Sequence, residues 1–342
     1  ADLFVLPSRI AKDGDRDGLP NVLMEAASQK LPLLSTPVSA IPEFITSGTT
    51  GVLSDDAPAA LAEAMQRFAE DPSPAPQAAD GDAGTGRLMR LAFYAPLKSP
   101  DHPVPSGDRA MARGLMAALQ RGGATVTVSS TLRSRDGAGD SAAQAMLFNA
   151  AEAEVTQATA RGRTEGWQAW ITYHNYYKAP DLIGPAVARA LGIPYLLVES
   201  SRARKRLTGP WAGFALAAEA ASDAADVIFY LTHRDAETLR RDQTVVQRLV
   251  HLPPFLAQGA LPLPSALDGP MLAVGMLRDG DKRASYQIIA ETLALLPTDS
   301  WRLDIAGDGP ARTEIETMMA PFGDAVRFLG ELDATAMAAA YR

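Results

Sequence analysis

The segment 13–25 has the sequence Asp-Gly-Asp-Arg-Asp-Gly-Leu-Pro-Asn-Val-Leu-Met-Glu. It joins an acidic loop, broken by glycines, to the start of an apolar-periodic stretch, and Pro20 stands where the first turn of a helix tolerates proline. We therefore predict a helix that begins near Pro20. Unpaired backbone amides and the positive end of the helix dipole meet at such an N-terminus, which suits a phosphate, a carboxylate or sugar hydroxyls.

The neighbouring segments extend this helix into a βαβ unit. Residues 1–8 and 31–36 are apolar runs that end in turn residues, as expected for buried strands, and 58–68 has the periodicity of an amphipathic helix. Strand, loop, helix and strand in this order predict a parallel sheet.

The acidic loop has two interpretations from its residues alone. Asp13, Asp15, Asp17 and Gly18 have the spacing of an EF-hand calcium loop, but Glu25 comes one position later than the glutamate of that motif. The other interpretation is a solvated acidic loop that precedes an ordinary helix. A calcium-binding module would be a protein of a different class, and it predicts a melting temperature that rises with calcium.

A third interpretation rests on the spacing of Asp17 and Glu25, with Gly18-Leu19-Pro20 directly after the first acid. This pattern resembles the EX7E motif of retaining glycosyltransferases of family 4, although that family usually has Glu where this chain has Asp17. The resemblance implies an α/β fold of the GT-B type, with two Rossmann-like domains that face a cleft. It also implies that Glu25 hydrogen-bonds the ribose of a nucleotide sugar, while Asp17, Gly18, Leu19 and Pro20 position the transferred sugar.

Composition excludes several classes of protein. The chain has 342 residues, 47% of them hydrophobic and 21% charged, which is enough for two cores of ordinary size. Its net charge of -8 argues against a nucleic-acid-binding protein. No apolar run is long enough to span a membrane, no signal peptide is recognisable, and no cysteine is available for disulfides or thiolate sites. We expect a cytoplasmic protein, with peripheral contact to the inner face of a membrane left open.

Changes in composition predict the domains. Residues 71–87 alternate proline with small residues and then with glycine, which is typical of a flexible linker. By resemblance, 1–70 would be the second half of the donor domain, 88–262 the acceptor-side Rossmann-like domain, and 263–342 the first half of the donor domain. The donor halves stand in reversed order, which indicates a circular permutation or a fragment of two tandem enzymes.

The segment 271–296 resembles the beginning of the family's donor domain. We predict a strand at 271–278 and a helix at 285–296, and Arg278 with Lys282 resembles the family's Gly-Arg-x-x-x-x-Lys pattern with altered spacing. A pair of fixed cations would neutralise the charge that develops on a leaving nucleoside diphosphate.

A Gly-x-Gly sequence follows the next predicted strand. Gly307 and Gly309 suggest a dinucleotide-binding fingerprint, but Pro310 and Arg312 interrupt it, so a Rossmann dehydrogenase is disfavoured. We assign Gly307 and Gly309 to the donor site instead.

Acceptor-side candidates follow the predicted strands of 88–262, because ligands of open α/β sheets bind beyond the carboxyl ends of the strands. They are Gly107 and Asp108 after strand 89–94, His174 after strand 167–173, and Glu199 and Arg202 after strand 195–198. Many family members have a histidine where this chain has Glu199. The basic run 202–206 would either hold an anionic acceptor or form a solvated loop.

The resemblance predicts a retaining glycosyltransferase that works without a covalent enzyme intermediate. Its substrates would be a UDP- or GDP-linked sugar and a glycan or glycolipid acceptor. No metal or other cofactor would be required, because Arg278 and Lys282 would do the metal's electrostatic work. The alternative from another class is a catalytically silent scaffold that binds a nucleotide or sugar, for which nucleoside diphosphate binding without turnover would be diagnostic.

Overall fold

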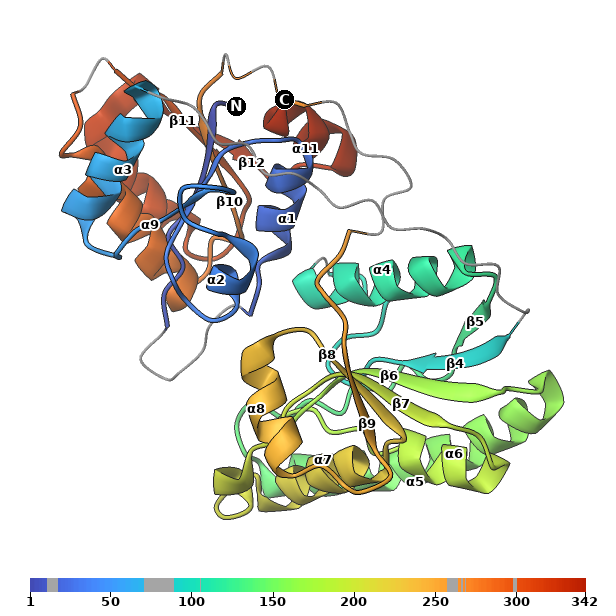
Figure 1. Ribbon diagram of the computed structural model, residues 1–342. Helices are drawn as coiled ribbons and strands as arrows, with labels where there is room; N and C mark the ends of the chain where they lie inside the picture. Colours follow the sequence, from blue (N-terminus) through green and yellow to red (C-terminus); the bar gives the residue numbers. More distant parts are fainter. Residues whose placement is uncertain are drawn as a thin grey trace. The chain divides into compact units, whose positions relative to one another are not determined.

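A computed structural model describes residues 1–10, 18–70, 89–104, 106–256, 264–265, 267, 269–297 and 300–342. The chain divides into two compact units. The first unit contains the described residues of Ala1–Asp80 and Gln258–Arg342, and the second unit contains those of Gly81–Ala257. Each unit is a sheet with helices packed on both faces (Figure 1).

The sheet of the first unit has six parallel strands drawn from both ends of the sequence. In spatial order they are β12 (Val326–Gly330), β11 (Leu303–Ala306), β10 (Met271–Val274), β1 (Leu3–Leu6), β2 (Leu33–Ser35) and β3 (Val52–Leu53). The central pair is β1 with β10, where Leu3 lies opposite Met271 and Phe4 opposite Leu272. If the strands are counted from β10, their order is the 3-2-1-4-5-6 of a doubly wound Rossmann sheet.

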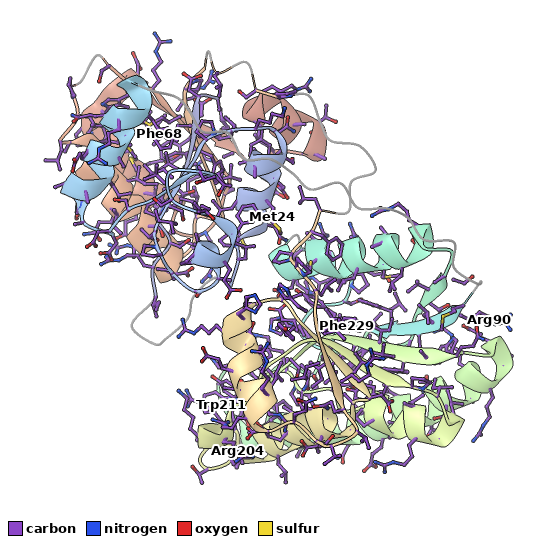
Figure 2. All side chains as sticks on the ribbon, viewed as in Figure 1. Met24, Phe68, Arg90, Arg204, Trp211 and Phe229 are labelled. Atoms are coloured by element: carbon purple, nitrogen blue, oxygen red, sulfur yellow. The ribbon has the colours of Figure 1, made fainter. Side chains whose placement is uncertain are left out.

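The central strands of this sheet are apolar because helices cover both faces. Along β1, Leu3 and Val5 point to one face, while Phe4 and Leu6 point to the other. The helices on the first face are α3 (Pro58–Glu70), α9 (Asp281–Leu293) and α10 (Arg312–Met319), and those on the second are α1 (Asn21–Ser28), α2 (Ile41–Phe44) and α11 (Ala334–Tyr341). Figure 2 labels one buried side chain from each set, Phe68 of α3 and Met24 of α1. A short 3-10 helix, Ala320–Ala325, leads into β12.

The second unit also has six parallel strands. Their spatial order is β5 (Thr125–Val128), β4 (Arg90–Tyr94), β6 (Ala169–Asn175), β7 (Tyr195–Ser200), β8 (Val227–Tyr230) and β9 (Arg248–His251). The helices are α4 (Gly107–Arg121), α5 (Ser141–Glu165), α6 (Gly184–Leu191), α7 (Ala212–Ala224) and α8 (His233–Arg241), with a 3-10 helix at Arg204–Arg206. The direction of winding reverses between β4 and β6, and such a reversal is where open α/β sheets bind ligands.

The predicted α/β fold with two Rossmann-like domains, one built from the two ends of the chain, is confirmed. The predicted helix at 285–296 begins earlier, at Asp281, because Gly280 has a φ of +89° and turns the loop directly into the helix. The predicted strand at 271–278 ends at Val274. None of the described helices is long and apolar enough to cross a membrane.

Two strands of the second unit end later than predicted. β6 continues through His174 to Asn175, and β7 continues through Glu199 to Ser200. The two strands remain in register at this end, with Asn175 opposite Ser200. His174 and Glu199 therefore lie at the carboxyl ends of neighbouring strands rather than in the loops that follow them.

Candidate functional site

The donor-side candidates of the first unit follow strands whose carboxyl ends share one edge of the sheet, since all its strands are parallel. The candidates placed by the structure are Gly18, Leu19 and Pro20 in the segment that leads from β1 to α1, Glu25 in α1, Arg278 and Lys282 after β10, and Gly307 and Gly309 after β11. Pro20 is the N-cap residue of α1 rather than its first helical residue. Asp17 lies outside the described residues.

The loops after β10, β11 and β12 pack backbone against backbone through two glycines. Gly307 has a φ of +139° and donates its amide to the carbonyl of Gly330 at 2.7 Å. A Cβ on Gly307 would overlap the carbonyl oxygen of Gly275, and one on Gly309 would overlap that of Leu277. Only glycine fits these positions, and the close approach fixes the course of the loop that carries Arg278.

Arg278 and Lys282 meet at a buried carboxylate. The side chain of Asp281, the first residue of α9, is 3% exposed. One of its oxygens lies 2.9 Å from Nη2 of Arg278, and the other lies 4.0 Å from Nζ of Lys282. Asp281 thus holds both cations in one place. Two fixed cations at one place on the sheet edge suit an anion.

Glu25 lines a cavity of about 250 Å³ between α1 and α11. Its Oε2 accepts a hydrogen bond of 2.9 Å from the hydroxyl of Tyr341. Burial and the charge of Glu25 raise the pKa of Tyr341, so this hydroxyl stays protonated and donates. Leu332 and Met337 add apolar surface to the same cavity. A carboxylate fixed beside apolar walls suits a ligand that combines hydroxyls with a flat ring.

A second cavity, of about 440 Å³, lies at the carboxyl ends of β2 and β3. Its lining residues are Thr36, Pro37, Val38, Leu53, Ser54, Asp55 and Asp56. The hydroxyl of Thr36 donates to the carbonyl of Ser8, which ties this cavity to the end of β1. These residues were not among the predicted site residues, and the signal for them is their place directly after two strands.

In the second unit, Asp108 and His174 form a contact across the reversal in winding. Oδ1 of Asp108, in the first turn of α4 after β4, lies 3.2 Å from Nδ1 of His174 near the end of β6. Gly107 is the first residue of α4, and the Ser106 hydroxyl caps the helix by accepting from the amide of Arg109 at 3.2 Å. Because this cap fixes the first turn of α4, it positions Asp108 in contact with the imidazole of His174.

A third titratable group, Glu199, adds to this contact. Both His174, with φ of 68°, and Glu199, with φ of 57°, have a left-handed backbone that side chains of this kind rarely adopt. Burial alone lowers the pKa of His174, but the charge of Glu199 and the hydrogen bond to Asp108 raise it overall. Burial also opposes ionisation of Asp108, yet the hydrogen bond and charge of His174 lower the pKa of Asp108. Burial raises the pKa of Glu199. Asp108, His174 and Glu199 can therefore share a proton, which would be bound by the imidazole or by one of the two carboxyls.

Arg202 makes its contacts elsewhere. Its side chain is 2% exposed, and Nη1 lies 2.8 Å from Glu219 and 2.6 Å from Asp223, both in α7. Nη2 also donates to the carbonyl of Asp242 at 3.3 Å. Arg202 therefore connects the loop after β7 to α7 and to the end of α8, and among the described residues it does not contact Asp108 or His174.

We expect His174→Gln to remove a pH-dependent part of the stability of the second unit. The folded pKa of His174 is raised above its ordinary 6.5 by Asp108, Glu199 and Asp235, so its contribution is complete below that pH and is lost as pH rises through the folded pKa. The stability of the wild type relative to the variant should therefore fall by on the order of 1 kcal/mol between about pH 6 and about pH 9. Urea unfolding at several pH values measures this, and a difference that does not change with pH would contradict it.

Two further residues of these sites were not predicted. Asp281 stands between Arg278 and Lys282 in the sequence, but the helix that it begins was predicted to start at 285. Tyr341 had no local signal, since it is 316 positions from Glu25. Within the described ranges, no group of three or more His, Asp or Glu side chains is arranged to hold a metal ion. The aspartates of the calcium interpretation, Asp13, Asp15 and Asp17, lie outside those ranges.

Comparison with known proteins gives a family match for one part of the chain. Residues 1–71 match the family described as Glycosyl transferases group 1. Over 71 residues the chain is 44% identical to the amylovoran biosynthesis glycosyltransferase AmsK of Erwinia amylovora, and over 69 residues it is 44% identical to the putative colanic acid biosynthesis glycosyltransferase WcaL of Salmonella typhimurium. Each alignment covers 20% of this chain and 17% of the relative.

Similar solved structures include the apo form of the lipopolysaccharide outer core galactosyltransferase WaaB, with a TM-score of 0.41 and 15% identity over 72% of this chain and 70% of that one. Another is the S. aureus MnaA structure with UDP, with a TM-score of 0.44 and 12% identity over 73% and 70% of the two chains. The alignments with the curated relatives cover 69 to 71 residues, and the chain spans 17% of the length of those relatives. The similarity to glycosyltransferases of group 1 therefore applies to residues 1–71, the segment that contains Glu25.

Proposed function

We propose that this protein is a retaining glycosyltransferase of the GT-B type that moves a sugar from a nucleotide-sugar donor to a hydroxyl acceptor. The observation that carries the proposal is the set of groups on the first unit, where Glu25 lines a cavity and Arg278 and Lys282 converge on Asp281. The family match of residues 1–71, with the spacing of Asp17 and Glu25, supports the same activity.

The first unit would hold the donor. The cavity beside Glu25 receives the nucleoside, whose ribose hydroxyls donate to the Glu25 carboxylate while Leu332 and Met337 contact the flat base. Tyr341 is a positioning residue in this scheme, since its hydrogen bond orients Glu25. The amides of Gly18 and Leu19, together with Asp17, place the transferred sugar.

Arg278 and Lys282 would bind the diphosphate of the donor. As the bond between the sugar and the phosphate breaks, negative charge accumulates on the leaving oxygen, and fixed cations stabilise that charge without having to reorganise. Asp281 keeps the two cations together before the donor arrives. Their positive charge serves the electrostatic role that a divalent cation has in other sugar transferases, so we propose a UDP- or GDP-linked donor and no metal requirement.

The second unit would bind the acceptor near Asp108, His174 and Glu199. Retention follows if the acceptor hydroxyl attacks the face of the sugar from which the diphosphate leaves. The proton of that hydroxyl then passes to the departing phosphate, and no covalent enzyme intermediate forms. The names of the curated relatives refer to amylovoran and colanic acid biosynthesis, and we extend this to an acceptor that is a growing glycan or a glycolipid.

We also infer that residues 271–342 and 1–70 act as one donor domain, related to the usual order by circular permutation or by the joining of tandem enzymes. The pairing of β1 with β10 supports this inference. So does Ser265, whose hydroxyl lies 2.6 Å from the carbonyl oxygen of Ala1 and 3.0 Å from that of Arg342.

Calorimetric titration with UDP, GDP and their sugar derivatives tests the donor site. We expect one nucleotide to bind with a Kd of about 10 µM, and Glu25→Ala to weaken it by about tenfold, because a charge-assisted hydrogen bond is lost. Glu63→Ala is the matched control, since Glu63 lies in α3 and pairs only with its helix neighbour Arg67 among described residues. If no nucleotide binds to the folded protein, the transferase proposal fails, and binding without turnover would favour the silent scaffold.

A further inference from the structure

Three loops at the carboxyl edge of the second sheet are joined by hydrogen bonds into one surface. The amide of Asp136, after β5, donates to the carbonyl of Lys178, after β6, at 2.9 Å. Trp211, after β7, donates its indole N–H to the carbonyl of Asp136 at 3.1 Å, and Gln144 donates to the carbonyl of Pro210 at 3.0 Å. These hydrogen bonds fix the positions of the loops relative to one another, and with them the positions of their side chains.

Two cations of this surface lie over the same two aromatic rings. Cζ of Arg206 is 5.1 Å from the ring centre of Tyr177 and 5.6 Å from that of Trp211. Nζ of Lys178 is 5.8 Å and 5.7 Å from the same two centres. The rings stand edge to face, 5.9 Å apart. Attraction to the rings holds both cations close together despite their mutual repulsion.

No carboxylate neutralises these two cations among the described residues. Neither Lys178 nor Arg206 has an ion pair there, and Nε of Arg206 is buried without a hydrogen-bond partner. The nearby carboxylate of Asp136 instead accepts from the amides of its own loop at 2.8 to 3.1 Å and from Gln144 at 2.7 Å. Burial opposes its charge, but these bonds lower the pKa of Asp136, so they already satisfy it.

The other arginines of the same basic run are paired. Arg202 binds Glu219 and Asp223, and Arg204 lies 2.8 Å from Asp242. Figure 2 labels Arg204 and Trp211, which belong to the same loop. Among the described residues, Arg202 and Arg204 are therefore paired with carboxylates, whereas Arg206 contacts aromatic rings and forms no ion pair.

Aromatic contacts connect the two unbalanced cations to the proposed acceptor site. The ring centres of His174 and Tyr176 are 4.9 Å apart, and those of Tyr176 and Tyr177 are 5.7 Å apart. Tyr177 then contacts both cations. An acceptor whose hydroxyl lies beside His174 would extend along these rings toward Lys178 and Arg206.

We propose that Lys178 and Arg206 bind a phosphate group of the acceptor, so that the substrate of the second unit is a phosphate-bearing glycan rather than a neutral one. This inference rests on the transferase function proposed above. A guanidinium stacked on rings keeps its N–H donors in its own plane, where they match phosphate oxygens, and the lysine adds a second charge.

The test compares Lys178→Gln/Arg206→Gln with Arg204→Gln/Lys205→Gln, which removes the same number of charges from the loop that contains Arg206. Pyrophosphate is titrated in the presence of saturating UDP or GDP, whichever binds, so that the donor site is occupied. We expect the first double variant to lose about fivefold or more in pyrophosphate affinity, and the control to lose less than about twofold. Equal losses in both variants would overturn the proposal, because general charge would then account for the binding.

Vesicles of phosphatidylcholine with and without phosphatidylglycerol identify the source of the phosphate. Weaker vesicle binding by the first double variant alone supports a lipid-borne phosphate, and unchanged vesicle binding with weaker pyrophosphate binding supports a soluble or glycan-borne one. If the first double variant weakens neither pyrophosphate binding nor vesicle binding, the proposal is overturned. UDP and GDP binding is measured in every variant: its absence throughout refutes the transferase function, whereas its presence with no effect of Lys178 and Arg206 refutes only this inference.

Discussion

Replacing both Arg278 and Lys282 with glutamine is expected to weaken the binding of UDP or GDP by about a hundredfold or more, since each lost charge-assisted hydrogen bond is worth about 1.5 to 3 kcal/mol. The two cations converge on the buried Asp281, and the diphosphate would face a positive group that water screens only in part. Calorimetry with the nucleoside diphosphate measures the loss.

This double substitution also removes two countercharges from Asp281, which destabilises the fold by itself. The binding experiment is therefore repeated on the triple variant that adds Asp281→Asn. Arg283→Gln is the control on the same helix, because Arg283 is paired with Glu314. Uridine and guanosine lack the diphosphate and should bind all variants equally. A nucleoside that loses as much affinity as its diphosphate would show that the cations do not act on the phosphates.

Much of the first unit could be predicted because its sequence signals are local. Residues 3–6 are apolar on both faces of a strand, and they lie within the buried strand predicted at 1–8. The helix of Asp281–Leu293 was predicted to begin at 285. In the structure, Gly280 turns the chain and the helix begins directly after it. Its first residue, Asp281, is buried and is paired with Arg278.

The parts of the sites that were not predicted depend on contacts between residues far apart in the sequence. Tyr341 reaches Glu25 only because the two ends of the chain share a sheet, and no local pattern encodes that pairing. The left-handed backbones of His174 and Glu199 could not be predicted either, since both residue types favour other conformations. Likewise, the basic run 202–206 looks uniform in sequence, and only its partners separate Arg202 and Arg204 from Arg206.

Gly307→Ala is expected to destabilise the first unit by about 3 kcal/mol or more. Two costs add: the backbone has a φ of +139°, which alanine rarely adopts, and the new Cβ overlaps the carbonyl oxygen of Gly275. Neither segment can move away easily, because both are held by hydrogen bonds. The amide of Gly307 donates to the carbonyl of Gly330, and the amide of Gly275 donates to the carbonyl of Ala306. Equilibrium unfolding in urea measures the loss, and hydrogen exchange of peptides from the first unit locates it.

Gly48→Ala separates these two costs. Gly48 belongs to the same unit and has a φ of +80°, but a Cβ there meets no atom within 4 Å. It should cost only the backbone term of about 1 to 2 kcal/mol. If Gly307→Ala costs no more than Gly48→Ala, the close packing of the loops is not what requires glycine. A larger cost, accompanied by weaker nucleotide binding, would mean that Gly307 serves stability and function through one contact, because the loop pushed away at Gly275 is the one that carries Arg278.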